Sequence, residues 1–96
     1  MIMELFVEVD GVKTHFPMYD GETMEDVDKR IDDYRIRRRK RTFISKRLDE
    51  IECKDEFYRD CALMWDEYFE KSYQVLLDNP NITLEEFLKQ TGIDKL

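Results

Sequence analysis

Residues 3–16 read Met-Glu-Leu-Phe-Val-Glu-Val-Asp-Gly-Val-Lys-Thr-His-Phe, and this stretch decides how the fold begins. Asp10-Gly11 is a two-residue turn pair that tolerates the positive φ angles of a type I′ turn, so the stretch predicts a β-hairpin. With the turn at this pair, Val9 faces Val12 and the register of both strands is set. One face of the hairpin is then apolar and consists of Leu5, Val7, Val9, Val12, Thr14 and Phe16.

The second face of the hairpin supports the same register. It carries Phe6 and His15, and it places Glu8 directly opposite Lys13, a favourable pair of opposite charges. A two-stranded ribbon is only marginally stable alone. We therefore expect the hairpin over residues 3–16 to pack on helices.

Three helices are predicted after a turn-rich connection over residues 17–22. The first covers about 24–53, where apolar residues from Met24 to Tyr34 follow a 3-4-3 spacing behind Thr23, a predicted N-cap. The sequence has no Pro or Gly between Thr23 and Pro80, so this helix either is continuous or kinks near Thr42.

Two further helices complete the prediction. Asp55 is expected to cap a helix over 56–78, and Thr83 with Glu86 forms a capping box for a helix over 84–91. The expected fold is α+β and mostly α-helical, with the N-terminal hairpin packed on three helices. Residues 1–96 show no domain boundary and are expected to form a single domain.

Charge is strongly segregated along the chain. The net charge is −7 over 96 residues, which argues against general nucleic-acid binding through bulk electrostatics. Yet residues 29–47 contain ten basic and two acidic residues, which leaves six basic and 21 acidic residues elsewhere. This asymmetry is the most distinctive feature of the sequence.

The basic residues culminate in residues 35–41, called the basic segment below. Its six cations are Arg35, Arg37, Arg38, Arg39, Lys40 and Arg41. The guanidinium group of Arg forms paired hydrogen bonds with carboxylates and with phosphates. The segment therefore suits an acidic protein partner or self-association, and less well a nucleic acid. Base-stacking aromatic residues are not interleaved with the cations, and a merely solvated helix face is a third interpretation.

The predicted helix over 56–78 is the most aromatic part of the chain. Its aromatic stripe consists of Phe57, Trp65, Tyr68, Phe69 and Tyr73. Such a stripe usually forms core. The aromatic area exceeds what one hairpin and one helix need to cover, and we expect part of it to meet a partner chain.

No catalytic or ligand-binding pattern is apparent, and we expect neither an enzyme nor a cofactor, metal or small-molecule substrate. His15 is the only histidine and has no partner at metal-ligand spacing. Cys53 and Cys61 are expected to be reduced thiols, at least one of them buried. The chain lacks an apolar run long enough for a membrane span and a basic, apolar leader, so we expect a cytoplasmic protein.

The layout resembles the tail assembly chaperones of tailed phages. The matching parts are residues 3–9, the Asp10-Gly11 turn and Ile82 to Phe87, about a fifth of the chain. The resemblance implies a non-enzymatic helper that oligomerises and coats a long protein during assembly. The expected function is therefore a non-catalytic interaction module, an assembly chaperone or adaptor of phage type that binds an acidic partner or itself through the basic segment.

An alternative from another class stays open. The chain would then be a small phage or bacterial inhibitor or regulator of a nucleic-acid-handling protein. It would act either by binding nucleic acid through the basic segment or by mimicking nucleic acid with its acidic surface. Binding of nucleic acid through the basic segment would weaken steeply with salt.

Overall fold

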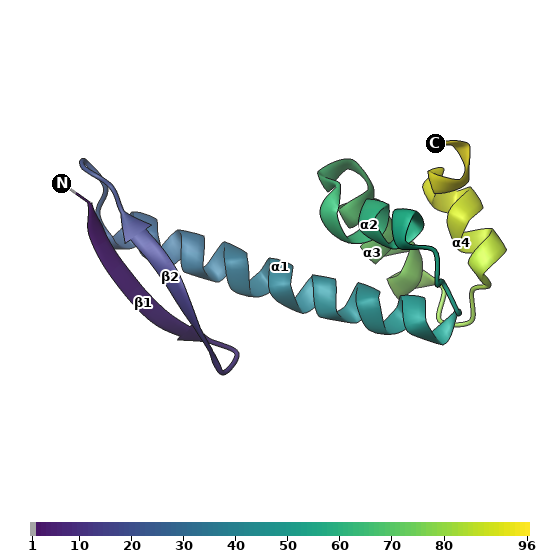
Figure 1. Cartoon of the computed structure of the whole chain (residues 1–96), viewed down its shortest axis with the longest axis horizontal. Helices are drawn as coiled ribbons and strands as arrows, with labels where there is room; N and C mark the ends of the chain where they lie inside the picture. The colour runs from purple at the N-terminus through teal and green to yellow at the C-terminus, as the bar shows by residue number, and fades with distance from the viewer. Residues whose placement is uncertain (1) are drawn as a thin grey trace. The chain divides into compact units, whose positions relative to one another are not determined.

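The computed structural model describes residues 2–96. The elements follow in the order β1 (Met3–Val9), β2 (Val12–Met18), α1 (Met24–Glu50), α2 (Glu56–Met64), α3 (Asp66–Asp78), α4 (Leu84–Thr91) and a short 3₁₀ helix, η1 (Ile93–Lys95) (Figure 1). The predicted α+β, mostly helical class is confirmed.

Contacts divide the chain into two compact units, Met1–Arg39 and Lys40–Leu96. Helix α1 contributes its first part to one unit and its last part to the other. The single domain expected over residues 1–96 stays a prediction.

The hairpin forms in the predicted register. Val9 pairs with Val12, Glu8 with Lys13 and Leu5 with Phe16. Asp10 and Gly11 have φ angles of 49° and 83°, as a type I′ turn requires. The register and the turn are therefore both confirmed.

Strand β2 extends beyond the predicted end of the hairpin, to Met18. Met3 pairs with Met18 and Glu4 with Pro17. Proline is tolerated because both strands of a two-stranded sheet are edge strands, where the missing N–H breaks no inner ladder. The Pro17 carbonyl also accepts a hydrogen bond from Arg30 of α1.

The apolar face of the hairpin packs on the first part of α1. Val9, Phe16, Val27 and Ile31 form the buried cluster of this unit, with Tyr34 edge-on to Phe16 at a ring-centroid distance of 5.5 Å. Four buried side chains are a small core. The opposite face is open, and Phe6 is 58% exposed there beside His15.

Helix α1 is continuous through Thr42 but ends at Glu50, before the predicted end at residue 53. Glu52 adopts a left-handed conformation with a φ angle of 60°, and the Cys53 amide donates to the Leu48 carbonyl over 2.9 Å. This is a Schellman-type ending in which Cys53 turns inward and is buried. No glycine signals the ending, which is why the local pattern missed it.

The prediction of a single helix over 56–78 is wrong, because a break at Trp65 divides this segment into α2 and α3. Trp65 is extended, with φ −89° and ψ 116°. An unbroken helix of that length would run for about 34 Å, longer than a small core can cover. The break lets α3 pack against both α2 and α4 instead.

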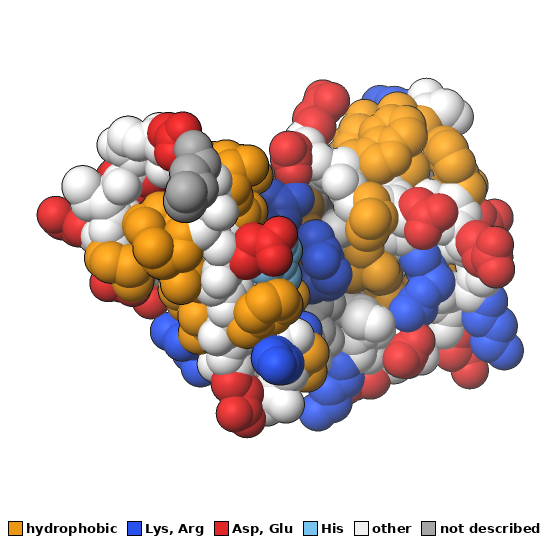
Figure 2. All heavy atoms as spheres, turned by 60° about the vertical axis from the view of Figure 1, so that its left-hand side comes forward, with side chains coloured by type: hydrophobic (Ala, Val, Ile, Leu, Met, Phe, Trp, Pro, Cys, Tyr) orange, Lys and Arg blue, Asp and Glu red, His pale blue; other side chains and the backbone are white. Residues whose placement is uncertain are grey.

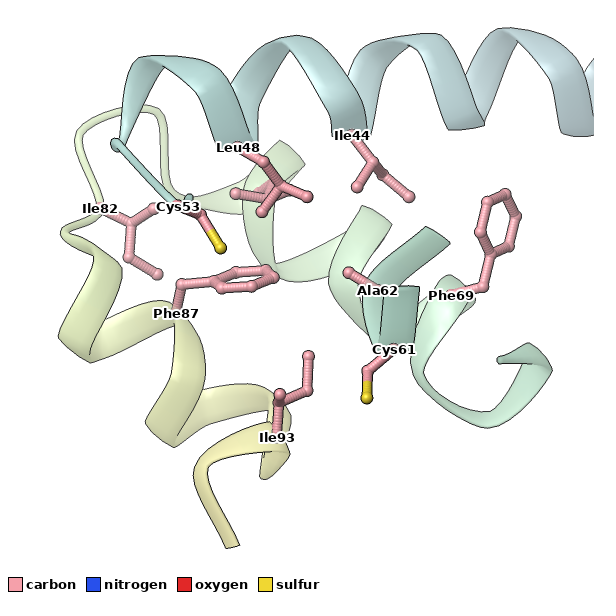
Figure 3. Close-up of a cluster of buried hydrophobic side chains, with 10 residues drawn as sticks. Ile44, Leu48, Cys53, Cys61, Ala62, Phe69, Ile82, Phe87 and Ile93 are labelled. Carbon is pink, nitrogen blue, oxygen red and sulfur yellow. The ribbon is translucent and has the colours of Figure 1, made fainter. Parts of the chain in front are cut away.

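The core of the second unit lies among α1, α2, α3 and α4 (Figure 3). Ile44 and Leu48 point from α1 toward Phe87 of α4 and Ala62 of α2. The capping box of α4 is confirmed, since Thr83 accepts from the Glu86 amide over 3.2 Å and Gly92 ends the helix at a φ angle of 80°.

Candidate functional site

All six cations of the basic segment lie on helix α1. With 3.6 residues per turn, seven consecutive residues point around the whole helix, so the cations do not form one stripe. Ile36 lies among them and is 54% exposed. The segment thus presents cations around an exposed aliphatic side chain.

Two cations of the segment make ion pairs within the first unit. Arg35 Nη1 lies 3.2 Å from Asp32 Oδ1, and Arg39 Nη2 lies 3.3 Å from Asp10 Oδ1 at the hairpin turn. Asp32 and Arg39 are about two-thirds exposed. Exposed ion pairs of this kind each stabilise a protein by at most about 1 kcal/mol. A carboxylate of a binding partner can therefore replace Asp32 or Asp10 at small cost.

Lys40 is held more firmly, within the second unit. Its Nζ lies 3.0 Å from Glu70 Oε2 and 5.0 Å from the ring centroid of Tyr73. The ammonium therefore makes an ion pair and a cation–π contact with α3. Arg37 and Arg38 are half-buried and also have partners within the chain.

Arg41 differs from the other cations of the segment. Its Nε is buried and has no hydrogen-bond partner within residues 2–96. An orphaned guanidinium N–H carries a desolvation cost that an oxygen ligand would remove.

Arg41 also borders a shallow surface groove of about 450 Å³. The groove is lined by Arg41, Thr42, Ser45, Lys46 and Asp49. Arg59 of α2 contacts two of these residues, with Nη1 at 3.0 Å from Asp49 Oδ1 and Nη2 at 3.3 Å from Ser45 Oγ. The cationic surface therefore continues from Arg41 to Lys46. The sequence already indicates this extension, because residues 41, 42, 45, 46 and 49 are spaced to lie on one face of a helix.

The residues considered for chemistry do not assemble into a reactive site. His15 stacks beside Phe6 at a centroid distance of 5.0 Å and lies 4.0 Å from Glu4. Within residues 2–96 no group of three or more His, Cys, Asp and Glu side chains is placed to hold a metal ion. In the same range, no helix combines the length and the apolar character that crossing a membrane requires.

Cys53 and Cys61 are both free and buried. Burial raises the pKa of the Cys53 thiol above its ordinary value of 9.0, with Arg59 acting in the opposite direction. Burial also raises the pKa of the Cys61 thiol, and Asp60 adds to the effect. Both sulfurs are therefore protonated, weakly nucleophilic core groups.

No family model matches the chain. Neither a curated protein nor a solved structure shows significant similarity to it.

Proposed function

We propose that this protein is a non-catalytic interaction module whose basic segment binds an acidic surface on a protein partner. The observation that carries the proposal is the dense set of six cations on one helix, around the exposed side chain of Ile36. Arg is favoured at protein interfaces because its fork pairs with carboxylates and its stem covers apolar surface.

The internal ion pairs favour exchange with a partner. The Arg35–Asp32 and Arg39–Asp10 pairs each have one partner that is about two-thirds exposed, and such pairs give little stability in water. A partner that excludes water around the same cations strengthens their pairs with its own carboxylates. The aliphatic side chain of Ile36 adds apolar burial to a contact that is otherwise electrostatic.

The same proposal covers the biological role expected from the sequence, a cytoplasmic assembly chaperone or adaptor of phage type. A helper of this kind has to hold a partner reversibly. Exposed ionic contacts around a small apolar centre fit that need, because they form quickly and dissociate readily.

The test uses a labelled helical peptide with glutamates along one face, titrated with the protein and followed by fluorescence anisotropy. The variant Arg37→Gln/Arg38→Gln/Arg41→Gln should bind about tenfold more weakly or worse, a loss of about 1.4 kcal/mol. Raising the salt concentration should weaken wild-type binding.

The matched control removes the same charge elsewhere in the chain. Lys71, Lys89 and Lys95 are exposed, so Lys71→Gln/Lys89→Gln/Lys95→Gln changes the net charge equally and should bind the peptide like the wild type. Equal weakening of both triple variants would show only a general charge effect, and would contradict the proposal.

The groove beside Arg41 favours a second candidate function, regulation of a nucleic-acid-handling protein through contact with phosphate. Hydroxyls from Thr42 and Ser45 lie beside Arg41 and Lys46, a combination that suits phosphate oxygens. Under this reading a duplex DNA should outcompete the acidic peptide, with an affinity that falls steeply with salt. If the acidic surface of the chain instead mimics nucleic acid, the chain should bind a DNA-handling protein and should not bind DNA.

A further inference from the structure

An exposed cluster of apolar side chains lies where α2 meets α3. Phe57, Met64 and Trp65 are 48%, 61% and 46% exposed. We call these residues, together with the half-buried Tyr68, the aromatic corner. Large, contiguous exposed apolar side chains are uncommon on a protein surface unless they bind something.

The rings of the aromatic corner contact one another. Phe57 meets Trp65 edge-on at a centroid distance of 6.2 Å, and Trp65 lies 6.1 Å from Tyr68. The break at Trp65 brings a residue from each helix to the same place. The rings therefore hold one another in position, and a partner would find a preformed surface.

Acidic residues flank the aromatic corner along α2 and α3. Glu56 and Asp60 belong to α2, and Asp66 and Glu67 belong to the first turn of α3; all four are exposed. On α2, Asp60 lies one turn from both Phe57 and Met64. The basic residue of α2, Arg59, is directed to Asp49 and the Cys53 carbonyl.

On the face of the molecule drawn in Figure 2, hydrophobic side chains lie at the surface among acidic and basic ones. A surface with an apolar centre and acidic residues flanking it is complementary to a ligand with an apolar centre and basic residues around it. That ligand is an aliphatic or aromatic side chain carried on a basic helix.

We propose that the aromatic corner binds the basic segment of a second copy of this chain. The inference rests on the function proposed above, and it names the acidic surface that the basic segment binds. Ile36 of one copy packs on Trp65 and its neighbours in the next copy. The surrounding cations then meet the four carboxylates that flank the aromatic corner.

The charge distribution of the chain favours a second copy as the occupant. Residues 29–47 hold ten basic and two acidic residues, whereas the remaining chain holds six and 21. The basic segment and the aromatic corner are different surfaces, so each copy offers one of each. Such a contact is head-to-tail, and it builds rings or open chains of copies rather than closed two-fold dimers.

The experiment measures the mass of the full chain by light scattering over a range of concentrations. The wild type should associate as its concentration rises, and high salt should oppose association. Met64→Lys and Ile36→Glu should each raise the dissociation constant about tenfold or more. Circular dichroism establishes that each variant retains its helices.

Matched controls place the same changes elsewhere. Leu77 of α3 is 49% exposed and Met24 of α1 is 52% exposed. Leu77→Lys and Met24→Glu should associate like the wild type. If they weaken association as much as Met64→Lys and Ile36→Glu do, the interface is elsewhere and the inference is wrong.

Mixing the two interface variants gives the sharpest result. Met64→Lys keeps an intact basic segment and Ile36→Glu keeps an intact aromatic corner, so the mixture should form a complex of one copy of each. Absence of that complex overturns the head-to-tail contact.

The wild-type chain provides a readout without substitution. Trp65 is the single tryptophan, and its emission should move to shorter wavelength as the copies associate. A chain that stays monomeric at every concentration, with unchanged Trp65 emission, overturns the inference. If that monomer still binds the acidic peptide through residues 35–41, the proposed function stands; if the peptide does not bind either, both fail.

Discussion

Glu52 carries the least favourable backbone conformation at the end of α1. A side chain with a Cβ atom at a φ angle of 60° costs about 1–2 kcal/mol, and glycine largely avoids that cost. The ending is retained because Cys53 and Leu48 are buried beside it.

Glu52→Gly should therefore raise the free energy of unfolding, by about 0.5–1 kcal/mol after the entropy of glycine is subtracted. Chemical denaturation measures the change. Glu52→Ala keeps the Cβ atom and should give no such gain. A gain of equal size in both variants would mean that the Glu52 carboxylate, not the backbone, is unfavourable.

Because of the two buried thiols, we expect the stability of the folded chain to fall at alkaline pH. Their pKa values are raised above 9.0 in the folded chain by burial, while in the unfolded chain they titrate near that value. Above pH 9 the unfolded state therefore loses thiol protons first and binds fewer protons than the folded state. Stability is retained below this pH and falls as the pH rises through the raised pKa values.

Denaturation at a series of pH values tests this effect. Above pH 9 the free energy of unfolding of the wild type should fall more steeply than that of Cys53→Ala/Cys61→Ala, which has no thiols to titrate. Other groups titrate in the same range, so the difference between the two slopes is the readout. Parallel slopes would show that the thiols are not the cause.

At the scale of elements, α4 depends on its N-terminal cap. Thr83 accepts from the Glu86 amide, and Ile82 and Phe87 are buried on either side of the first turn. Thr83→Ala should lower the free energy of unfolding by about 1 kcal/mol, measured by chemical denaturation. Thr83→Ser keeps the oxygen and should recover most of the loss; an equal loss in both variants would assign the effect to the methyl group.

The elements that the sequence predicts well are those with local signals. The hairpin follows from one turn pair and two consistent faces, and α4 from its capping box and Gly92. The break at Trp65 and the ending at Glu52 have no such signal. Both depend on how α2, α3 and α4 pack together, and packing overrides an uninterrupted helical pattern.

The candidate site was predictable only in part for the same reason. The six cations of the basic segment are evident in the sequence. Their partners are not, because Asp10 lies 29 residues from Arg39 and Glu70 lies 30 residues from Lys40. The aromatic stripe predicts excess aromatic surface, but only the fold separates the buried Phe69 from the exposed Phe57 and Trp65.

At the scale of the whole molecule, stability should be uneven along the chain. Among the described residues, ten buried side chains form the main cluster of residues 40–96, against four in residues 2–39. Local opening is easier where less apolar surface is buried. Amides of α4 should therefore exchange with deuterium more slowly than those of β1 and β2, and faster exchange in α4 would contradict this account.

The central claim is that residues 35–41 form the binding surface for an acidic partner. It is tested most directly by recording amide NMR spectra of the 11.8 kDa chain while the glutamate-rich peptide is added at low salt. We predict that the largest shifts fall on residues 35–41 and extend toward Lys46, and that high salt reverses them. Saturable binding with its largest shifts outside that stretch, or no shifts at all, would contradict the claim.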